Sequence, residues 1–390
     1  MTQPQIEIQI IASLVAVACS LPGAYLVLRK MAMITDAITH AILPGIVVGF
    51  ILTGSVNSFL LIVLAAASGL LTVVLVELIL KTRLIAEDAA IGLVFSALFS
   101  IGVILISKNV GNVHLDTDTV LLGELAFAPF DRLMIAGWDA GPKSAWVMGI
   151  ILILNLLFIG IFYKELKLST FDAGLAASLG FAPAVLNYAL MGLVSVTTVG
   201  AFDAVGAILV VALMIAPAAT AYLITDKLKW MILISAVAGI VSAISGYWVA
   251  RMLDASIAGS MAMMCGLIFL MAYLLAPGRG IIAVLHRRKR QKLEFAQMTL
   301  LMHVVNHMGT EKEQTESHIS HLRDHFGWNK QFVDAVVKRS VKQGIIKLDG
   351  QLIIVTNKGE RFTDAANALI SAGHHPGFSR LKNEFMIFTD

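Results

Sequence analysis

The sequence predicts an all-α polytopic membrane protein of about eight or nine transmembrane helices and a re-entrant segment. A C-terminal cytoplasmic winged helix-turn-helix domain of α+β structure is predicted to follow. Hydrophobic residues make up 58% of the chain and charged residues only 14%, and the mean hydropathy is +0.83. Beyond Arg279 the apolar runs stop and polar residues take over. This composition excludes a soluble single-domain protein and indicates a membrane part followed by a soluble part.

The membrane part contains nine apolar runs, each close to the length that crosses a bilayer, about 17–25 residues. They cover residues 8–28, 37–53, 58–80, 89–107, 145–163, 184–199, 204–224, 230–250 and 257–276. Residues 118–129 are too short and too broken to cross, so we expect a re-entrant or interfacial segment there. The first run lacks a basic leader and a cleavage site, which predicts that it is retained as a helix.

Basic residues follow every second run and set the orientation. They are Arg29, Lys30, Lys81, Arg83, Lys164, Lys167, Lys227, Lys229 and Arg279. Since cytoplasmic loops carry the excess of lysine and arginine, the N-terminus is predicted outside and the C-terminal domain in the cytoplasm.

The predicted domains are a transmembrane domain (residues 1–280), a basic juxtamembrane linker (281–293) and a cytoplasmic winged-helix domain (294–390). The linker contains the run HRRKRQK, which we expect to attract anionic membrane lipid. The last domain shows three helical patterns, the third ending near Gly344, and then two short strands around Asp349 and Gly350. Asp-Gly between apolar runs is a strong hairpin signal, and three helices with a hairpin predict a winged helix.

Asp36 and His40 lie inside the second apolar run, in the stretch MITDAITHAILPG. They are four residues apart and so share a helix face; His40 lies about 14 Å above Met31, near the membrane midplane. A carboxylate and an imidazole can both bind a first-row divalent ion, and ionisable groups at this depth usually line a pathway or pair with something. A hydrogen-bonded structural pair remains the alternative. Pro44 and Gly45 could kink the helix beside them.

Four blocks carry a resemblance to a known family. They are LRKMAMITDAITHAILPGIVVGFILTG, AEDAAIGLVFSALFSIG, LSTFDAGLAASLGF and VGAILVVALMIAPAATAYLI. In this order they resemble the membrane subunits of ABC-type manganese, zinc and iron importers, from residue 8 to about residue 277. The resemblance implies that Asp36 and His40 line the metal path.

The resemblance also implies a cytoplasmic helix that docks into the ATPase and couples it to transport. This coupling segment is short, rich in small residues and on the predicted inner side. It departs from the family pattern in having Ala173 where proline is common. Its residues are Ser169, Thr170, Phe171, Asp172, Ala173, Gly174, Leu175, Ala176, Ala177, Ser178, Leu179 and Gly180.

Other polar residues are weaker candidates. Asp203 is predicted between the sixth and seventh helices, near the outer face, as an extra ligand or entry charge. His114, Asp116 and Asp118 form an outer cluster that could attract an arriving cation or be a solvated loop. Glu77 and Glu124 are expected at the interface.

The C-terminal domain contains His318, His321 and His325 near one predicted helix face. A regulatory metal site and a solvated polar face are both open interpretations of this spacing. The domain resembles the winged-helix part of metal-responsive repressors. Lys330, Lys338, Arg339 and Lys342 would suit DNA, but Asp334 interrupts them and the domain is tethered to a membrane. Nucleic acid is therefore not the expected partner.

The resulting prediction is a permease subunit of an ATP-driven, binding-protein-dependent importer of divalent metal ions in the bacterial inner membrane. The chain contains no G-x-x-x-x-G-K-[ST] loop, so it is not an enzyme and a separate cytoplasmic ATP-binding subunit must hydrolyse ATP. The other expected partners are an extracytoplasmic metal-binding protein and a second permease copy, identical or homologous. No permanently bound cofactor is expected.

A carboxylate and an imidazole suit manganese, iron(II) or zinc better than copper(I), and the repressor-like extension favours manganese. Two alternatives remain. An importer of a metal chelate, such as a siderophore or corrinoid, would not need Asp36 and His40, and competition between chelate and free ion would distinguish it. A membrane-tethered metal-responsive regulator would protect specific DNA.

Overall fold

The chain divides into two compact units, Met1–Ala276 and Pro277–Asp390. The computed structural model describes residues 2–54, 59–109, 125–135 and 138–372. The predicted His114, Asp116, Asp118 and Glu124 lie outside these ranges, as does most of the predicted re-entrant segment.

The first unit is helical apart from one hairpin. Its elements are α1 (Gln3–Leu28), α2 (Met33–Ala41), α3 (Leu43–Thr53), α4 (Phe59–Lys81), α5 (Glu87–Asn109), the 3-10 turn η1 (Ala128–Phe130), β1 (Arg132–Ile135), β2 (Trp138–Pro142), α7 (Lys143–Ile161), α8 (Tyr163–Phe171), α9 (Ala173–Ser178), α10 (Pro183–Val205), α11 (Ala207–Ile224), α12 (Leu228–Leu253) and α13 (Ile257–Leu275). Within the described residues, nine helices are long and apolar enough to cross a membrane, with α2 and α3 together forming the second. The unit is therefore a polytopic membrane fold, as the hydropathy predicts.

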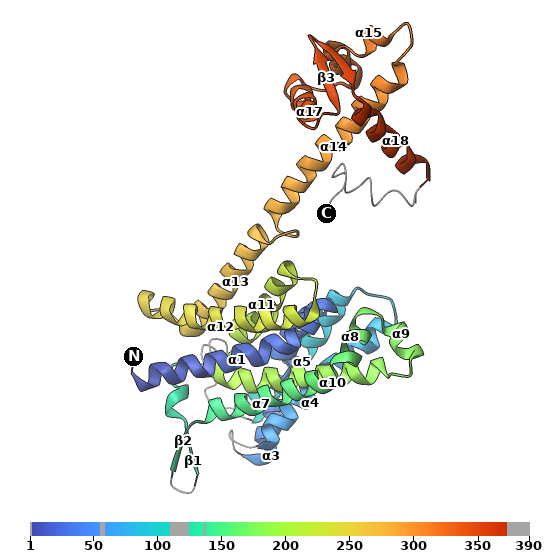
Figure 1. Ribbon diagram of the computed structural model, residues 1–390. Coiled ribbons are helices and arrows are strands. Elements are labelled where there is room, and N and C mark those ends of the chain that lie inside the picture. The colour runs from blue at the N-terminus through green and yellow to red at the C-terminus, as the bar shows by residue number, and fades with distance from the viewer. Residues whose placement is uncertain (1, 55–58, 110–124, 136–137, 373–390) are drawn as a thin grey trace. The chain divides into compact units, whose positions relative to one another are not determined.

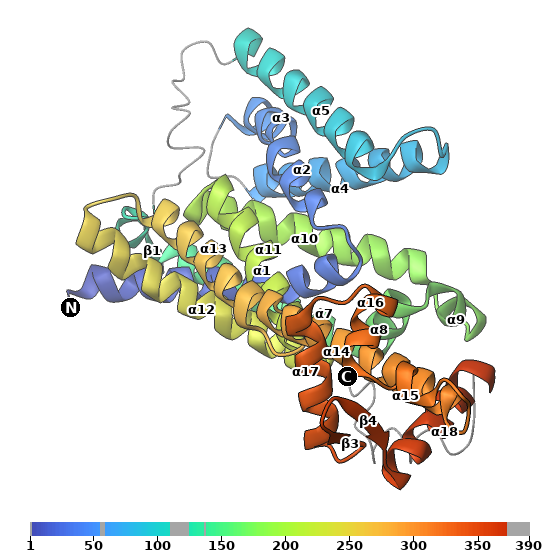
Figure 2. The ribbon, with the colours of Figure 1, turned by 90° about the horizontal axis from the view of Figure 1, so that it is seen from above.

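Helix α1 is the central helix of this unit and packs against α7, α10, α11 and α12 (Figure 1). Helices α2 to α5 form a second group beside it, joined to the first where α10 contacts α2 and α4 (Figure 2). The N-terminus and the β1–β2 hairpin lie at one end of the unit, and α8 and α9 at the other (Figures 1 and 2). The second group contains the segment with Asp36 and His40.

Pro22 lies inside α1, where it has no amide hydrogen to donate to the carbonyl of Ala18. Asn155 of α7 replaces that donor: its Nδ2 lies 2.8 Å from the Ala18 oxygen, and the fully buried amide also bonds to Thr197. A buried carbonyl without a partner would cost about 1–3 kcal/mol. The hydrogen bond from Asn155 therefore compensates for the proline in α1, which is the most buried of the membrane-spanning helices.

Gly45 lets α3 approach the backbone of α4. A Cβ at this position would lie 2.3 Å from the carbonyl oxygen of Leu64 and 2.8 Å from Cα of Ala65. Both atoms belong to backbone and cannot rotate away, so this position requires glycine for packing. The interruption between α2 and α3 falls at Ile42, two residues before Pro44.

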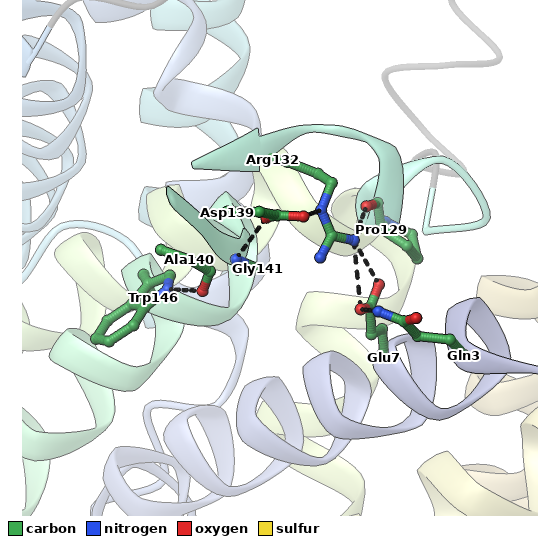
Figure 3. Close-up of polar contacts among 8 residues, drawn as sticks. All are labelled: Gln3, Glu7, Pro129, Arg132, Asp139, Ala140, Gly141 and Trp146. Carbon is green, nitrogen blue, oxygen red and sulfur yellow. Dashed lines mark hydrogen bonds and ion pairs between the residues drawn. The ribbon is translucent and has the colours of Figure 1, made fainter. Parts of the chain in front are cut away.

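The β1–β2 hairpin is a feature that the sequence analysis did not anticipate. Arg132 fastens it to α1: its guanidinium lies 3.2 Å from a Glu7 oxygen and 2.5 Å from Asp139, and it also donates to the Pro129 carbonyl (Figure 3). The hydrogen bond from the Gly141 amide, followed by that from Arg132, holds the pKa of Asp139 below its ordinary value. Strands of four and five residues leave too short a pattern for recognition from sequence.

The second unit contains α14 (Ile281–His307), α15 (Glu313–Glu316), α16 (Ile319–Phe326), α17 (Lys330–Lys342), β3 (Ile346–Asp349), β4 (Leu352–Val355) and α18 (Asn357–Ala372). Residues 281–293, predicted as a linker, are the first half of α14. Strands β3 and β4 pair antiparallel with Asp349 opposite Leu352, and Gly350 turns the chain with φ +61°. The core of this unit is separate and includes Leu301, Leu322 and Val336, all fully buried.

We predict that Gly45→Ala lowers the free energy of unfolding by about 1–3 kcal/mol, because the methyl group would force α3 away from α4. The measurement is the thermal unfolding of the purified chain in detergent. Gly160→Ala in α7 is the matched control, since a Cβ there meets nothing within 4 Å. The control should be neutral or stabilised by up to about 1 kcal/mol through helix propensity. Equal stability of Gly45→Ala and the parent would contradict the packing argument.

Candidate metal path

Helix α2 presents Asp36 and His40 together on one face. Oδ1 of Asp36 lies 3.6 Å from Nε2 of His40, so the two groups face each other without a tight hydrogen bond. Their side chains remain 41% and 35% exposed, respectively. The opposite face of α2 is buried and includes Ile34 and Ile38. The i, i+4 spacing therefore concentrates both ionisable groups on the open face of this helix.

Two rings of α5 border the imidazole. The ring centroids of Phe95 and Phe99 lie 5.8 Å and 6.2 Å from that of His40, Phe99 edge-on. These two rings lie beside the imidazole and cover part of it, while about a third of the His40 side chain stays exposed.

Pro44 changes the backbone beside the pair. Proline has no amide hydrogen, so the carbonyl of His40 loses its usual helical donor. At Pro22 the side chain of Asn155 makes good the same loss. Within the described part of the chain, no side chain donates to the His40 carbonyl. The segment thus has a carboxylate and an imidazole on one face of α2, and the carbonyl of His40 lacks its usual helical donor on the C-terminal side.

The structure describes two of the weaker candidates, Asp203 and Glu77, and neither lies with Asp36 and His40. Asp203 lies in the last turn of α10 and is exposed, rather than between two helices, because the helix continues to Val205. The next helix starts only after Gly206, which has φ +79°. Glu77 of α4 accepts a 2.9 Å hydrogen bond from Asn187 and another from Tyr188. It is thus a partner of α10 side chains.

The predicted coupling segment is divided into two helices. Asp172 adopts an extended conformation between α8 and α9, and its carboxylate accepts a 2.9 Å hydrogen bond from the Leu175 amide. It therefore caps α9 in the usual way for an aspartate. Phe171, Leu175 and Leu179 are 60%, 47% and 61% exposed, so the segment presents apolar side chains on its surface.

Arg29 joins this segment to the rest of the unit. Its guanidinium donates to Thr170 at 3.1 Å, to Ser169 at 3.1 Å and to Asn187 at 2.6 Å. Asn187 in turn donates to Glu77. The network connects the end of α1, just before α2, with α8, α10 and α4. Sequence reasoning used Arg29 only as an orientation charge, because its partners lie 140 or more residues away.

The C-terminal histidines are only partly grouped as the spacing suggests. His318 caps α16 and bonds to Ser320. His321 and His325 instead approach His303 of α14, with ring centroids 6.4 Å and 4.9 Å from it. His303 and Glu316 also belong to this group. They lie on α14 and α15, so the spacing of histidines within α16 could not indicate them. Arg339, one of the basic residues of α17, bonds to Glu294 at 2.9 Å and is not free to face a phosphate.

The fold is that of a polytopic membrane protein, and Asp36 and His40 place two ionisable groups inside one of its spans. The sequence profile of the ABC 3 transport family matches residues 5–276, and the chain belongs to this family.

Individual relatives agree with this assignment. The chain is 43% identical over 359 residues to the zinc transport system membrane protein TroD of Treponema pallidum, covering 92% of this chain and 98% of TroD. It is 47% identical over 269 residues to the manganese transport system membrane protein MntD of Bacillus subtilis, covering 69% and 91%. The solved structure of PsaBC from Streptococcus pneumoniae in complex with Fab superposes with a TM-score of 0.60 at 29% identity, covering 72% of this chain and 94% of that chain. The match to TroD is longer than the first unit and thus extends into the second.

We predict that Arg29→Ala lowers the free energy of unfolding by about 1–3 kcal/mol, because Ser169, Thr170 and Asn187 lose a charged donor. Thermal unfolding of the purified chain in detergent measures this. Arg83→Ala is the control: Arg83 also follows a span, is exposed, and makes no ion pair or side-chain hydrogen bond within the described residues. A loss of stability in the control as large as that in Arg29→Ala would refute a specific role for the network.

Proposed function

We propose that this chain is the permease subunit of an ATP-driven importer of divalent transition metal ions, and that Asp36 and His40 line the path of the ion. The observation that carries the proposal is their exposure. Charged or polar groups within a span do not face lipid at acceptable cost, so they face a partner or a water-filled path. A half-exposed carboxylate and imidazole on one helix face fit that description.

A second permease copy, identical or homologous, would supply the opposite wall. Two-fold assembly would place an equivalent pair across the path, so that two carboxylates and two imidazoles form a transient site. The ion is cargo and not a resident cofactor, and an extracytoplasmic metal-binding protein would deliver it.

Coupling to ATP hydrolysis would pass through α8 and α9. These two helices lie at the end of the unit opposite the N-terminus (Figures 1 and 2). A separate cytoplasmic ATP-binding subunit would bind their exposed apolar side chains. The Arg29 network would carry the movement onward, because Arg29 bonds to α8 and precedes α2 by a few residues. In this orientation the N-terminus lies outside and the second unit lies in the cytoplasm.

Manganese is the first candidate cargo, with zinc and iron as the others. The donors are a carboxylate and an imidazole, and carboxylate oxygens suit manganese. The relatives described above include manganese and zinc transport proteins. The proposal extends to the second unit, whose helices α14, α16 and α17 and whose β3–β4 hairpin would form a regulatory winged helix.

We predict that His40→Ala and Asp36→Ala each reduce uptake of the cargo metal by at least about tenfold. Loss of a residue that only hydrogen-bonds a metal ligand already weakens metal binding by about 10–100-fold, and each of these variants removes a proposed ligand itself. Cells without their own importers would express the chain with its ATPase and binding protein. Manganese and zinc uptake would be measured separately at matched membrane levels of each variant.

His286→Ala serves as the control, because this histidine lies outside the spans and its ring bonds to the Ile282 carbonyl of its own helix. Uptake in the control should equal that of the parent. Parental uptake in both path variants would leave Asp36 and His40 as a structural pair and remove the proposed path.

A further inference from the structure

The second unit brings three potential metal ligands to one point from three different elements. They are His303 of α14, Glu316 of α15 and His321 of α16. Oε2 of Glu316 lies 3.1 Å from Nε2 of His303 and 2.6 Å from Nε2 of His321. One ligand atom from each residue lies within 4.8 Å of the other two. Ligands about 2.0–2.2 Å from a tetrahedral zinc ion lie about 3.3 Å apart, so only small rearrangements would form a site.

Two further imidazoles lie beside this group. The ring centroid of His325 is 4.9 Å from that of His303 and 5.5 Å from that of His321. The ring of His307 is 4.9 Å from that of His303. Imidazoles that share one tetrahedral ion have ring centroids about 5 Å apart. His325 is close to both ligand histidines, but its nitrogens lie outside the group of atoms within 4.8 Å of one another, so it would become a fourth donor through a change of rotamer.

Ordinary hydrogen bonding leaves the group incompletely satisfied. Both nitrogens approach the same carboxylate oxygen, yet Nε2 of His321 is buried and has no partner with hydrogen-bond geometry. The side chains of His303 and Glu316 are only 10% and 16% exposed, so little water reaches them. Oε2 of Glu316 thus lies close to both imidazole nitrogens, and Nε2 of His321 is available as a ligand.

We propose that His303, Glu316, His321 and His325 form a binding site for a divalent transition metal of the zinc class, separate from the Asp36–His40 path. Three imidazoles and one carboxylate favour zinc over manganese, both by ligand type and by the general order of affinities. A bound ion would join the last turns of α14 to α15 and α16. The proposal is independent of the transport function, because it concerns only equilibrium binding in the second unit.

The test is zinc binding by the full chain in detergent after removal of metal. A chromophoric chelator competes for zinc, and an Asp36→Asn/His40→Gln background silences the proposed path. This background should bind one zinc ion tightly, and cobalt(II) in its place should give the visible bands of a tetrahedral site. Adding His303→Gln and His321→Gln should weaken zinc binding by about 100-fold or more. Loss of a residue that only hydrogen-bonds a metal ligand typically weakens binding by about 10–100-fold.

Glu316→Gln is the second variant, because it keeps the shape of the side chain and removes only the charge; it should weaken zinc and alter the cobalt bands. His318→Asn is the control, since asparagine still caps α16 and the residue lies outside the group. Unchanged affinity in the double variant, an equal loss in the control, or no zinc bound by the background would each overturn the proposal. Circular dichroism of the metal-free variants verifies that they fold.

Discussion

The constraint on which the rest of this structure depends is that hydrocarbon offers no hydrogen-bond partners to the backbone. Every carbonyl in a span therefore needs a donor from the protein, and every proline removes one. At Pro22 the chain supplies Asn155, a buried amide from another helix. Several hydroxyl groups, such as those of Thr39 and Thr72, bond to the carbonyl four residues before them. The carbonyls four residues before Pro44 and Pro217 have no such donor among the described side chains, and Pro44 adjoins the pair of ionisable groups on α2.

Much of the membrane fold could be predicted from the sequence, because hydropathy responds directly to the solvent around a helix. Most predicted spans end within a few residues of the observed helices, and the helix of the second run is interrupted at Ile42, near the Pro44 and Gly45 that could kink it. The prediction placed Asp203 in a loop because the apolar run fades at Val199. The helix nevertheless continues to Val205, held by packing against neighbouring helices. The β1–β2 hairpin was missed because its anchor, the Arg132–Glu7 pair, joins residues 125 positions apart.

The same distinction between local and distant interactions applies to the sites. Asp36 and His40 could be recognised because four-residue spacing is a local property of a helix. The Arg29 network could not, since hydrogen bonds to residues more than 100 positions away leave no pattern in the chain. The C-terminal histidines fall between these cases. Spacing within α16 pointed to His318, His321 and His325, but the fold selects two of them and adds His303 and Glu316 from other elements.

The close approach at Gly45 has a mechanical consequence. The backbone of α4 occupies the space that a side chain at position 45 would fill, so α3 and α4 cannot shift against each other without opening this contact. Helix α2, which holds Asp36 and His40, is interrupted from α3 at Ile42 but packs against α4 and α5 as well. A movement that repositions Asp36 and His40 therefore has to carry these neighbouring helices along or repack them.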